Sequence, residues 1–544
     1  MTLNLPVYAW NVSPTWSQVV QFEQHNPHEK HVVWCVLPDS VPHYELTSPQ
    51  NEYESSLHLA IQNALSCATT QAVHCVPNAW QNTHLWLIPQ SQASSLHAHF
   101  SVPIQWQTEA IAPAPEVAPK AWQTPPAADY LDPSSLHILI IGAGIAGAAT
   151  AYECAIRGAK VTVLEAQSQV AQAGSGNRQG LLYAKISPHA TEQTELLLSG
   201  YGYTRHLLRQ LLPEQATWQA CGVLHLNHNA KEAERNRKLA QQTQHAHLYR
   251  AVSAQQASEL AGICIEQDGL FWQQGAWLNP ASLVQKLLSH PNITLHTNQR
   301  LIQADYDDAM WHVRSNTHTW QGSHLVFCTG ASSLHTPIAQ TLPLQIIRGQ
   351  TSLVAANKSS LQLKIALSGA SYISPAWQGE HCFGATFAPN CADDTWQSAD
   401  EQHNRNELAQ LNNTLYQSFS TLWNEPSSLH ESSHGHAALR CDCHDHLPAV
   451  GALGDADAMR RVYAQYALDK NYRINTPCPY LPNAYINTAH GSRGLATAPL
   501  CAANIAAQIM NTPRLLSLRL RHALNPNRLI IKELVHGKVG AKSQ

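Results

Sequence analysis

The segment that decides the fold is HILIIGAGIAGAATAYECAIRGAKVTVLE, residues 137–165. It opens with the apolar run HILII (137–141), which is typical of a short buried strand, and the glycine-rich turn GAGIAG follows at once. A helix-forming stretch then leads to a second strand, KVTVLE (160–165). A strand, a tight turn, a helix and a strand in this order predict a parallel sheet. The chain is therefore expected to have an α/β fold.

The turn has the spacing Gly-x-Gly-x-x-Gly of a dinucleotide-binding fingerprint. The first glycine permits the turn, the second lets the backbone approach a pyrophosphate, and the third lets helix and strand pack closely. Glu165, at the end of the second strand, can accept hydrogen bonds from an adenosine ribose and disfavours a 2′-phosphate. The motif predicts FAD or NAD rather than NADP, and a glycine-rich turn without a ligand is the alternative. The residues expected to line the cofactor here are Gly142, Ala143, Gly144, Ile145, Ala146, Gly147 and Glu165.

Two later segments suit the same cofactor. GSGNRQG (174–180) combines small residues with hydrogen-bond donors and is expected to wrap the diphosphate and flavin side, although such a segment alone is more often a surface loop. HLVFCTGASS (324–333) is an apolar strand ending in Thr-Gly, which is common where a flavoprotein chain returns beneath the dinucleotide. The expected contacts are Gly176, Asn177, Arg178, Gln179, Gly180, Thr329 and Gly330.

The composition excludes several classes of protein. The 544 residues carry 33 Lys and Arg against 37 Asp and Glu, so the chain is not a globally basic nucleic-acid binder. No basic start followed by an apolar core opens the sequence, and no apolar stretch has the roughly 20 residues needed to span a bilayer. The 13 cysteines include no CxxC, which suits reduced thiols. We therefore expect a cytoplasmic protein without a membrane association.

Four regions follow along the chain. Residues 1–105 are expected to form a small α/β block, with strands at 31–38 and 84–89 and a helix at 55–68. Pro- and Ala-rich residues 106–134 are expected to be a linker, 135–512 the region that holds the dinucleotide fingerprint, and 513–544 a basic tail. Residues 511–544 hold seven Lys and Arg against one Glu, which fits either a phosphate-contacting surface or a solvated tail.

The segment ALRCDCHDHLPAVG (438–451) carries a candidate site. Its Cys and His residues do not have the spacing of a CxxC or HxxxH ligand pair, so no metal is expected. Arg440 is the stronger candidate, because a guanidinium can grip a carboxylate with two parallel hydrogen bonds. An ordinary structural salt bridge is the alternative for Arg440.

From about residue 135 onward the chain resembles the FAD-dependent oxidoreductase domain of the MnmC family, and more distantly glycine oxidase and D-amino-acid oxidase. The resemblance rests on segments in the family's order over about 400 residues: SGNRQGLLYAKIS (175–187), CGVLHL (221–226), GAWLNPASL (275–283), RGQ (348–350), RCDCHDHLPAVG (440–451), GSRGLATAPLCA (491–502) and ALNPNRLIIKELVHGK (523–538). Among these, SGNRQG, GSRGL and the LNPNR segment are more specific than the glycine-rich turn.

The resemblance implies a D-amino-acid-oxidase-like fold. A Rossmann-like FAD-binding domain would use about residues 135–218, 279–340 and 439–512. A substrate domain with a mixed or antiparallel sheet would be inserted at about 219–278 and 341–438. The implied activity removes the carboxymethyl group of 5-carboxymethylaminomethyl-(2-thio)uridine at the tRNA wobble position as glyoxylate and leaves 5-aminomethyl-(2-thio)uridine. FAD would accept the hydride, and oxygen would reoxidise it.

The resemblance also implies roles for single residues. Arg440 matches the arginine that binds the substrate carboxylate in glycine-oxidase-like enzymes, and Tyr372 is a weaker match for a hydroxyl at the same carboxylate. Arg493, Gly494 and Leu495 match a loop that closes over the flavin.

The N-terminal region departs from the family. Full-length members carry a methyltransferase domain, yet no glycine-rich turn after a strand precedes residue 135, so we expect no methyltransferase activity here. Residues 1–105 would then be a remnant, a docking module or a tRNA-positioning element. Two other functions stay open: a small-molecule oxidase of glycine, sarcosine or a D-amino acid, and a non-catalytic tRNA-binding flavoprotein.

Overall fold

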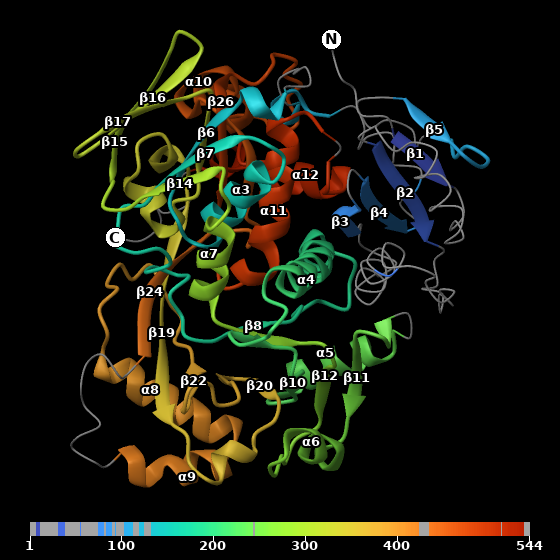
Figure 1. Cartoon of the computed structure of the whole chain (residues 1–544), viewed down its shortest axis with the longest axis vertical. Coiled ribbons are helices and arrows are strands. Elements are labelled where there is room, and N and C mark those ends of the chain that lie inside the picture. Colours follow the sequence, from blue (N-terminus) through green and yellow to red (C-terminus); the bar gives the residue numbers. More distant parts are fainter. Residues whose placement is uncertain are drawn as a thin grey trace.

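The computed structural model (Figure 1) describes residues 132–537, apart from residues 243, 244, 424–434 and 513. Nearer the N-terminus it describes only residues 7–10, 31–37, 55, 74–80, 83–89, 93, 103–112 and 119–124. The described chain has three parts: a domain around a mainly parallel sheet, a domain around a mixed sheet below it, and a small N-terminal sheet at one side (Figure 1).

The first part, called here the parallel-sheet domain, is centred on a six-stranded sheet with the order β14-β7-β6-β18-β26-β25. Its strands are β6 (His137–Ile141), β7 (Lys160–Leu164), β14 (Ile293–His296), β18 (His324–Phe327), β25 (Ala449–Gly454) and β26 (Tyr480–Thr488). All neighbours run parallel except β25 and β26. The apolar residues of β6 are all buried, as expected for a strand covered on both faces. The predicted parallel sheet is confirmed.

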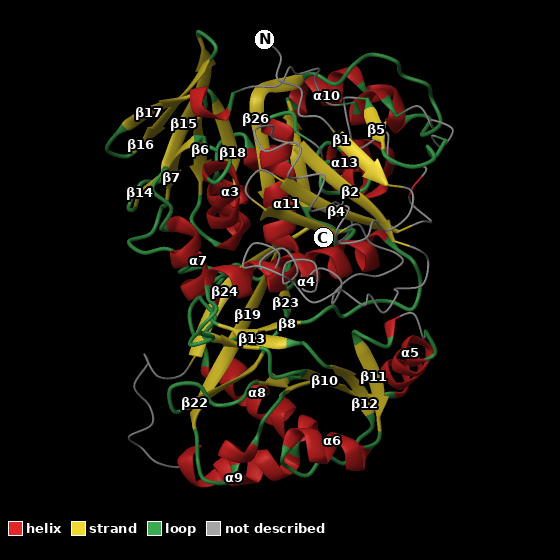
Figure 2. Ribbon diagram, turned by 45° about the vertical axis from the view of Figure 1, so that its right-hand side comes forward, coloured by secondary structure: helices red, strands yellow, loops and turns green. Residues whose placement is uncertain are grey.

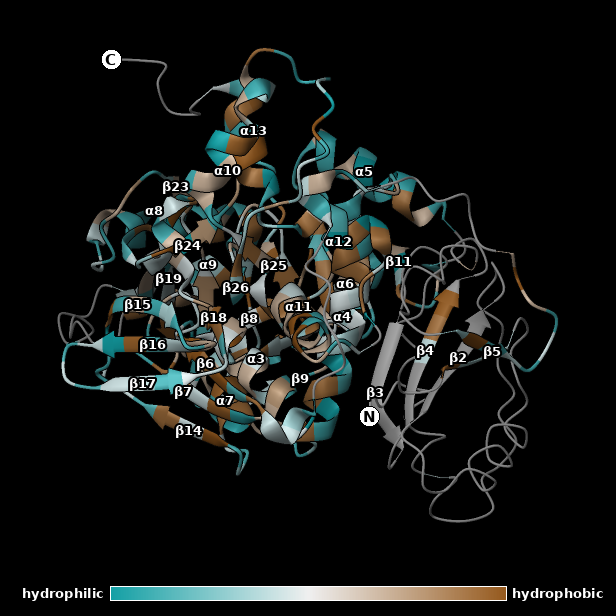
Figure 3. Cartoon of the chain, turned by 90° about the horizontal axis from the view of Figure 1, so that it is seen from above, coloured by the Kyte–Doolittle hydropathy of each residue, from teal (hydrophilic) through white to brown (hydrophobic). Residues whose placement is uncertain are grey.

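Different layers flank this sheet. Against one face lie helices that pack on one another, namely α3 (Ile145–Ala155), α4 (Glu192–Leu211), α7 (Pro280–Leu288) and α11 (Gly494–Ile509). Buried alanines on α3 and α11 let these two helices approach closely (Figure 2). Packed against β6 and β18 is a three-stranded antiparallel sheet, formed by β15 (Leu301–Asp307), β16 (Met310–Ser315) and β17 (Thr319–Gly322). This small sheet lies at the periphery, and its outer residues are largely hydrophilic (Figure 3).

The second part, the mixed-sheet domain, has a nine-stranded sheet with the order β11-β12-β10-β20-β21-β22-β19-β23, and β24 also pairs with β19. Its strands are β10 (Val223–Leu226), β11 (Tyr249–Val252), β12 (Gly269–Trp272), β19 (Gln345–Ala355), β20 (Ala366–Ser368), β21 (Tyr372–Ile373), β22 (Glu380–Gly384), β23 (Ala388–Pro389) and β24 (Gly435–Asp442). Only β10 and β20 run parallel, so the expected mixed sheet is confirmed. The helices of this domain are α5 (Ala230–Ala240), α6 (Ala254–Ala261), α8 (Ser398–Leu411) and α9 (Asn413–Trp423).

Two features connect the domains. The segments that run between the two domains form a three-stranded antiparallel sheet. Its strands are β8 (Gly180–Leu182), β9 (Trp218–Gln219) and β13 (Ala276–Leu278). The whole of β24 pairs with β19, so Arg440 stands on a strand of the mixed sheet. The expected change of domain near residue 439 therefore falls within a strand.

The N-terminal strands form a five-stranded sheet with the order β3-β4-β2-β1-β5, parallel except between β3 and β4. They are β1 (Val7–Trp10), β2 (His31–Leu37), β3 (His74–Trp80), β4 (Thr83–Pro89) and β5 (Ile104–Trp106). β2 and β4 coincide with the strands predicted at 31–38 and 84–89. The helix predicted at 55–68 lies outside the described residues except for Ser55. The role of this block and the expected lack of methyltransferase activity stay predictions.

The C-terminal segment folds as two helices, α12 (Leu518–Leu524) and α13 (Arg528–His536). Arg528 is 4 % exposed, and its guanidinium makes two hydrogen bonds to Asp445, of 2.9 and 3.0 Å. Lys532 also pairs with Asp445, and Arg519 pairs with Glu192. These three cations therefore hold the C-terminal helices to the parallel-sheet domain, whereas Lys538 and Lys542 lie outside the described residues.

No helix in the described part of the chain combines the length and apolar character needed to cross a bilayer. Within the same residues, no three Cys, His, Asp or Glu side chains are grouped so as to hold a metal ion, and this includes the Cys and His residues of 441–446.

Candidate functional site

The glycine-rich turn after β6 is shaped by contacts that only glycine allows. Gly142 has φ +102°, in the left-handed region, and a Cβ on it would lie 2.6 Å from the Cys328 carbonyl oxygen. A Cβ on Gly147 would collide with the Gly142 carbonyl oxygen. Around Gly144 the nearest atom to a Cβ is the Ser175 hydroxyl oxygen, at 3.2 Å. Two glycines thus serve the close packing of α3, whereas Gly144 keeps the backbone accessible as a pyrophosphate requires.

Ser175 lies at the N-terminus of α3, and sequence reasoning did not single it out. Its hydroxyl accepts a hydrogen bond of 3.0 Å from the backbone N–H of Ile145, the first residue of the helix. The free N–H groups and the dipole make a helix N-terminus an anion site, and Ser175 adds a hydroxyl there. The signal was present, because Ser175 belongs to the GSGNRQG segment (174–180).

Glu165 is fixed beside the same turn. One carboxylate oxygen accepts a hydrogen bond of 2.7 Å from the Ala143 N–H, and the other accepts one of 2.9 Å from the Gln167 N–H. Each carboxylate oxygen keeps a further lone pair, as recognition of ribose hydroxyls requires. The Cα of Thr329 lies 3.5 Å from the Cβ position of Gly142, so the strand-end Thr-Gly pair also reaches the turn. Turn, helix N-terminus and carboxylate together fit the adenosine diphosphate part of FAD.

The loop of residues 174–180 faces the mixed-sheet domain. The Asn177 amide donates to the Gln179 carbonyl at 2.9 Å and to the Tyr372 hydroxyl at 3.0 Å. Arg178 pairs with Glu380 at 3.0 Å. Gln179 is fully buried, and its amide donates to a backbone carbonyl of the mixed-sheet domain while its side-chain oxygen has no partner. These side chains tie the two domains together, and their contact with the cofactor stays a prediction.

The N-terminus of α11 meets that of α3. A Cβ on Gly494 would be 3.6 Å from the Ile145 side chain, and a Cβ on Gly180 would be 2.6 Å from the Leu495 side chain. The structure therefore brings the GSRGL segment (491–495) beside both the turn and the GSGNRQG loop. No described residue forms a hydrogen bond or an ion pair with the Arg493 guanidinium, and burial lowers its pKa although Asp442 and Tyr183 oppose that shift.

Arg440 stands on β24, and its side chain reaches over the neighbouring strand β19. A Cβ on Gly349 would be only 2.5 Å from the Arg440 Cζ and both terminal nitrogens, so the guanidinium covers the glycine. Its hydrogen bond to the protein is 3.3 Å long and goes to the Thr386 carbonyl. No described Asp or Glu pairs with it, so the structural salt bridge is not found there, and burial lowers the pKa of Arg440. A partly buried guanidinium held without a carboxylate is suited to bind one from a ligand.

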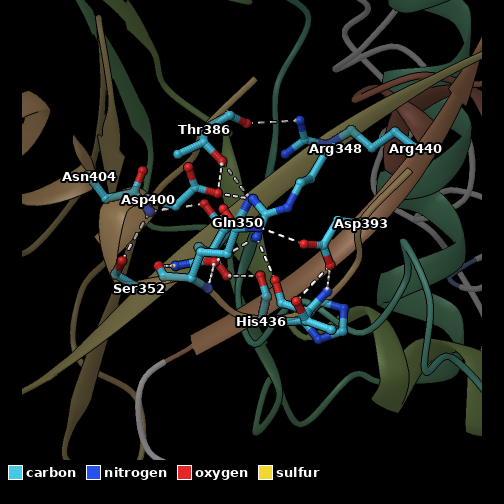
Figure 4. Close-up of polar contacts among 12 residues, drawn as sticks. Arg348, Gln350, Ser352, Thr386, Asp393, Asp400, Asn404, His436 and Arg440 are labelled. Carbon is cyan, nitrogen blue, oxygen red and sulfur yellow. Dashed lines mark hydrogen bonds and ion pairs between the residues drawn. The ribbon is translucent and has the colours of Figure 1, made fainter. Parts of the chain in front are cut away.

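A polar network holds the backbone around this guanidinium (Figure 4). Buried Arg348 pairs with Asp400 and donates to the Thr395 carbonyl at 2.6 Å. The Gln350 N–H donates to the Thr386 hydroxyl at 2.9 Å, and the Gln350 amide donates to a carbonyl of the segment before α8. In the RGQ segment (348–350), arginine and glutamine therefore fix neighbouring loops, and glycine leaves the space that Arg440 occupies.

Tyr372 is brought close enough to Arg440 for the two to interact electrostatically. Its hydroxyl donates to the Gln179 carbonyl at 3.0 Å and accepts from the Asn177 amide at 3.0 Å. Burial raises the pKa of Tyr372 well above its usual value, so the phenol is neutral at pH 7. To bond a substrate carboxylate, this hydroxyl has to turn away from Gln179.

Comparisons with known proteins agree with this architecture. Residues 137–508 match the family described as "FAD dependent oxidoreductase". The chain is 39 % identical over 404 residues to a protein of Chromobacterium violaceum named tRNA 5-methylaminomethyl-2-thiouridine biosynthesis bifunctional protein MnmC, and this match covers 74 % of the chain and 60 % of that protein. A protein of the same name from Pseudomonas putida is 38 % identical over 402 residues, with the same two coverages. The chain thus spans less than two thirds of the length of these relatives.

Solved structures show the same fold. Glycine oxidase from Bacillus cereus matches with a TM-score of 0.53 at 17 % identity and covers 69 % of this chain and 95 % of that one. L-proline dehydrogenase from P. horikoshii matches with a TM-score of 0.55 at 14 % identity and covers 72 % of this chain and 97 % of that one. With the dinucleotide turn, the carboxylate of Glu165 and the match over residues 137–508, the chain belongs to the FAD-dependent oxidoreductase family.

Proposed function

We propose that this chain removes the carboxymethyl group from 5-carboxymethylaminomethyl-(2-thio)uridine at the wobble position of tRNA by an FAD-dependent oxidation. The products are 5-aminomethyl-(2-thio)uridine and glyoxylate. The observation that carries the proposal is the Arg440 guanidinium, which is held over Gly349 without a carboxylate partner among the described residues. The names of the relatives, which refer to tRNA 5-methylaminomethyl-2-thiouridine biosynthesis, support tRNA as the substrate class.

The proposed substrate arm, –CH2–NH–CH2–COO⁻, ends in the anion that Arg440 is suited to bind. Two parallel N–H···O bonds would fix both the position and the plane of the carboxylate. The Thr386 carbonyl accepts a hydrogen bond from one end of the guanidinium, and Gly349, which has no side chain, leaves the space in which the guanidinium lies. The residues of this chain thereby orient the methylene carbon between the amine and the carboxylate, which is the carbon to be oxidised.

The reaction balances as follows. The methylene carbon gives up a hydride and the amine nitrogen a proton, so that a C=N bond forms, and water then adds to the carbon and the C–N bond breaks. In total R–CH2–NH–CH2–COO⁻ and water give R–CH2–NH2, glyoxylate, two electrons and two protons. Bound FAD supplies the two-electron acceptor, and oxygen is the proposed final acceptor, reduced to hydrogen peroxide. The protein has to hold the amine in its neutral form and keep the C–H bond aligned.

Rapid mixing of the oxidised holoprotein with substrates tests the proposal. We expect tRNA carrying the carboxymethylaminomethyl group to bleach the flavin absorbance and release glyoxylate, and admission of air to restore the flavin colour. Glycine, sarcosine and D-alanine should bleach it at least a hundredfold more slowly. The opposite order would identify a small-molecule amine oxidase, and no bleaching by any of these would identify a non-catalytic flavoprotein.

A further inference from the structure

A group of cations lies at the meeting point of the two domains. Lys185 follows β8, Arg493 precedes α11, and Lys231 and Arg235 stand on α5. We call these four residues the cation line. The Lys185 ammonium nitrogen lies 3.9 Å from a carboxylate oxygen of Glu232, which also pairs with Arg235. Glu232 therefore brings Lys185 and Arg235 together, and Lys185 is within electrostatic range of Lys231 and Arg493.

Acidic groups balance this charge only in part. Glu232 is one counter-charge. Burial alone would raise the pKa of Glu232, but the hydrogen bond with His225 and the charges of Lys185 and Arg235 have the larger effect and lower this pKa to about 2. Asp442, whose charge acts on Arg493, is the other, and it already pairs with His446 at 2.8 Å. Burial lowers the pKa of His225 to about 4, so this ring is neutral at pH 7. Four cations thus face two carboxylates.

The cation line runs from the surface inward. Lys231 is exposed, the Lys185 side chain is 37 % exposed and the Arg235 side chain is 21 % exposed. The buried Nε of Arg235 has no hydrogen-bond partner, and the Arg493 guanidinium has none among the described residues. Like charges that are crowded together and partly desolvated raise the free energy of the unliganded protein, and a bound anion relieves that repulsion.

The other anions of the reaction already have partners. The diphosphate of FAD fits the turn at Gly144 and the Ser175 hydroxyl, and the carboxylate of the substrate arm fits Arg440. Lys185, Lys231 and Arg235 belong to neither group of residues, and α5 carries Lys231 to the surface. Arg493 is the member next to the turn, because its neighbour Gly494 lies beside Ile145. An anion bound at the cation line therefore belongs to a part of the substrate other than the carboxymethylaminomethyl arm.

We propose that Lys185, Arg235 and Arg493 form a subsite for a backbone phosphate of the RNA strand next to the modified nucleotide, with Lys231 at its outer end. The inference rests on the proposed function, because it takes RNA as the substrate. A phosphate offers several acceptor oxygens to the guanidinium and ammonium donors, and each cation that contacts RNA adds to the salt dependence of binding.

The test measures binding of an unmodified anticodon stem-loop RNA to the holoprotein at a series of KCl concentrations. We expect Lys185→Gln to raise Kd roughly tenfold, as loss of a hydrogen bond between charged groups does. The logarithm of the association constant decreases linearly with the logarithm of the salt concentration. In Lys185→Gln this slope should become less steep by about 0.7–0.9, the contribution of one phosphate contact. Lys185→Arg should have the Kd and the salt slope of wild type. Lys231→Gln, which removes an exposed lysine, should raise Kd and make the slope less steep, but by less than Lys185→Gln.

Two controls make the outcome specific. Lys286→Gln removes an exposed lysine on α7, outside the cation line, and should leave Kd and the slope unchanged. The Kd for FAD should be unaffected by Lys185→Gln. An unchanged RNA slope in Lys185→Gln, or a loss of FAD affinity in place of RNA affinity, would overturn the subsite.

The reaction is checked separately on wild-type protein. If modified tRNA bleaches the wild-type flavin but Lys185→Gln leaves the salt slope unchanged, the proposed function stands and the subsite is wrong. If Lys185→Gln changes the salt slope but modified tRNA does not bleach the wild-type flavin, the RNA-binding subsite stands and the proposed reaction is wrong.

Discussion

The guanidinium of Arg440 covers the backbone of Gly349, and a Cβ at position 349 would fall 2.5 Å from three of its atoms. The two residues stand on the neighbouring antiparallel strands β24 and β19. The glycine is therefore required for the position of the arginine rather than for a backbone conformation of its own, since Gly349 does not have a left-handed φ.

Gly349→Ala should displace the Arg440 guanidinium and weaken substrate binding. We expect KM for the carboxymethylaminomethyl substrate to rise roughly ten- to a hundredfold, the usual effect of a misplaced binding group. FAD content and the melting temperature should change little. Gly174→Ala is the control, because a Cβ there would be 3.4 Å from the nearest atom, an ordinary contact. Equal kinetics for Gly349→Ala and wild type would show that Arg440 can bind from another position.

Arg440→Ala removes the proposed carboxylate partner. The expected cost is roughly 2–5 kcal/mol of transition-state binding, which corresponds to a loss of about 30- to 1,000-fold or more in kcat/KM. Arg440→Lys keeps the charge but not the paired hydrogen bonds, so its kcat/KM should lie between those of wild type and Arg440→Ala. Flavin-reduction kinetics measure both variants. A loss of less than about threefold in Arg440→Ala would mean that another group holds the carboxylate.

Glu165→Ala should weaken FAD binding, because this carboxylate is the expected partner of the adenosine ribose and also fixes the Ala143 N–H. A hydrogen bond to a charged group is worth about 1.5–3 kcal/mol, so Kd for FAD should rise roughly ten- to a hundredfold. Ser175→Ala should raise it by less. Fluorescence of released FAD measures both, and exposed Glu214→Ala should match wild type.

Stability should depend on pH through Glu195, which is 4 % exposed on α4 and accepts a hydrogen bond from Ser517. Burial raises its pKa to about 7, and the Ser517 hydrogen bond and the charge of Arg519 only partly offset this. The native state therefore keeps a proton that the unfolded chain releases above about pH 4.3. The free energy of unfolding should fall by roughly 3–4 kcal/mol as pH rises from about 4.3 to 7 and then level off.

Glu195→Gln tests this assignment, because the amide has a similar shape and no charge to bury. The variant should melt at a higher temperature than wild type at pH 8 and at a similar one at pH 5. Parallel melting curves for the two proteins across this range would assign the pH dependence to another group.

Arg528→Ala should destabilise the loop that follows β24, because it leaves the Asp445 carboxylate without its fork of hydrogen bonds. Breaking a buried ion pair on one side costs about 3–5 kcal/mol. Lys532→Ala, which removes an exposed partner of the same carboxylate, should cost about 1 kcal/mol or less. Chemical denaturation of both variants provides the comparison, and equal losses would argue against the buried fork.

Local patterns were sufficient for the dinucleotide half of the fold. The apolar run before Gly142, the glycine spacing and the acid at Glu165 are all within 29 residues, and the rules that link them act along the chain. The predicted strands, turn and helix are therefore found at β6, α3 and β7. The mixed sheet could be expected only from the family resemblance, because its strands come from distant segments with no common local signal.

Sequence alone determined the family, the cofactor class and Arg440 as the candidate carboxylate binder, since motifs and residue chemistry are carried by short segments. Only the tertiary structure decided what surrounds them. It placed Gly349 under Arg440, Ser175 at the N-terminus of α3, and Lys185 and Arg235 at the same carboxylate, that of Glu232. These partners are far apart along the chain, and their proximity depends on the register of β19 with β24 and on the packing of the two domains, which no local pattern encodes.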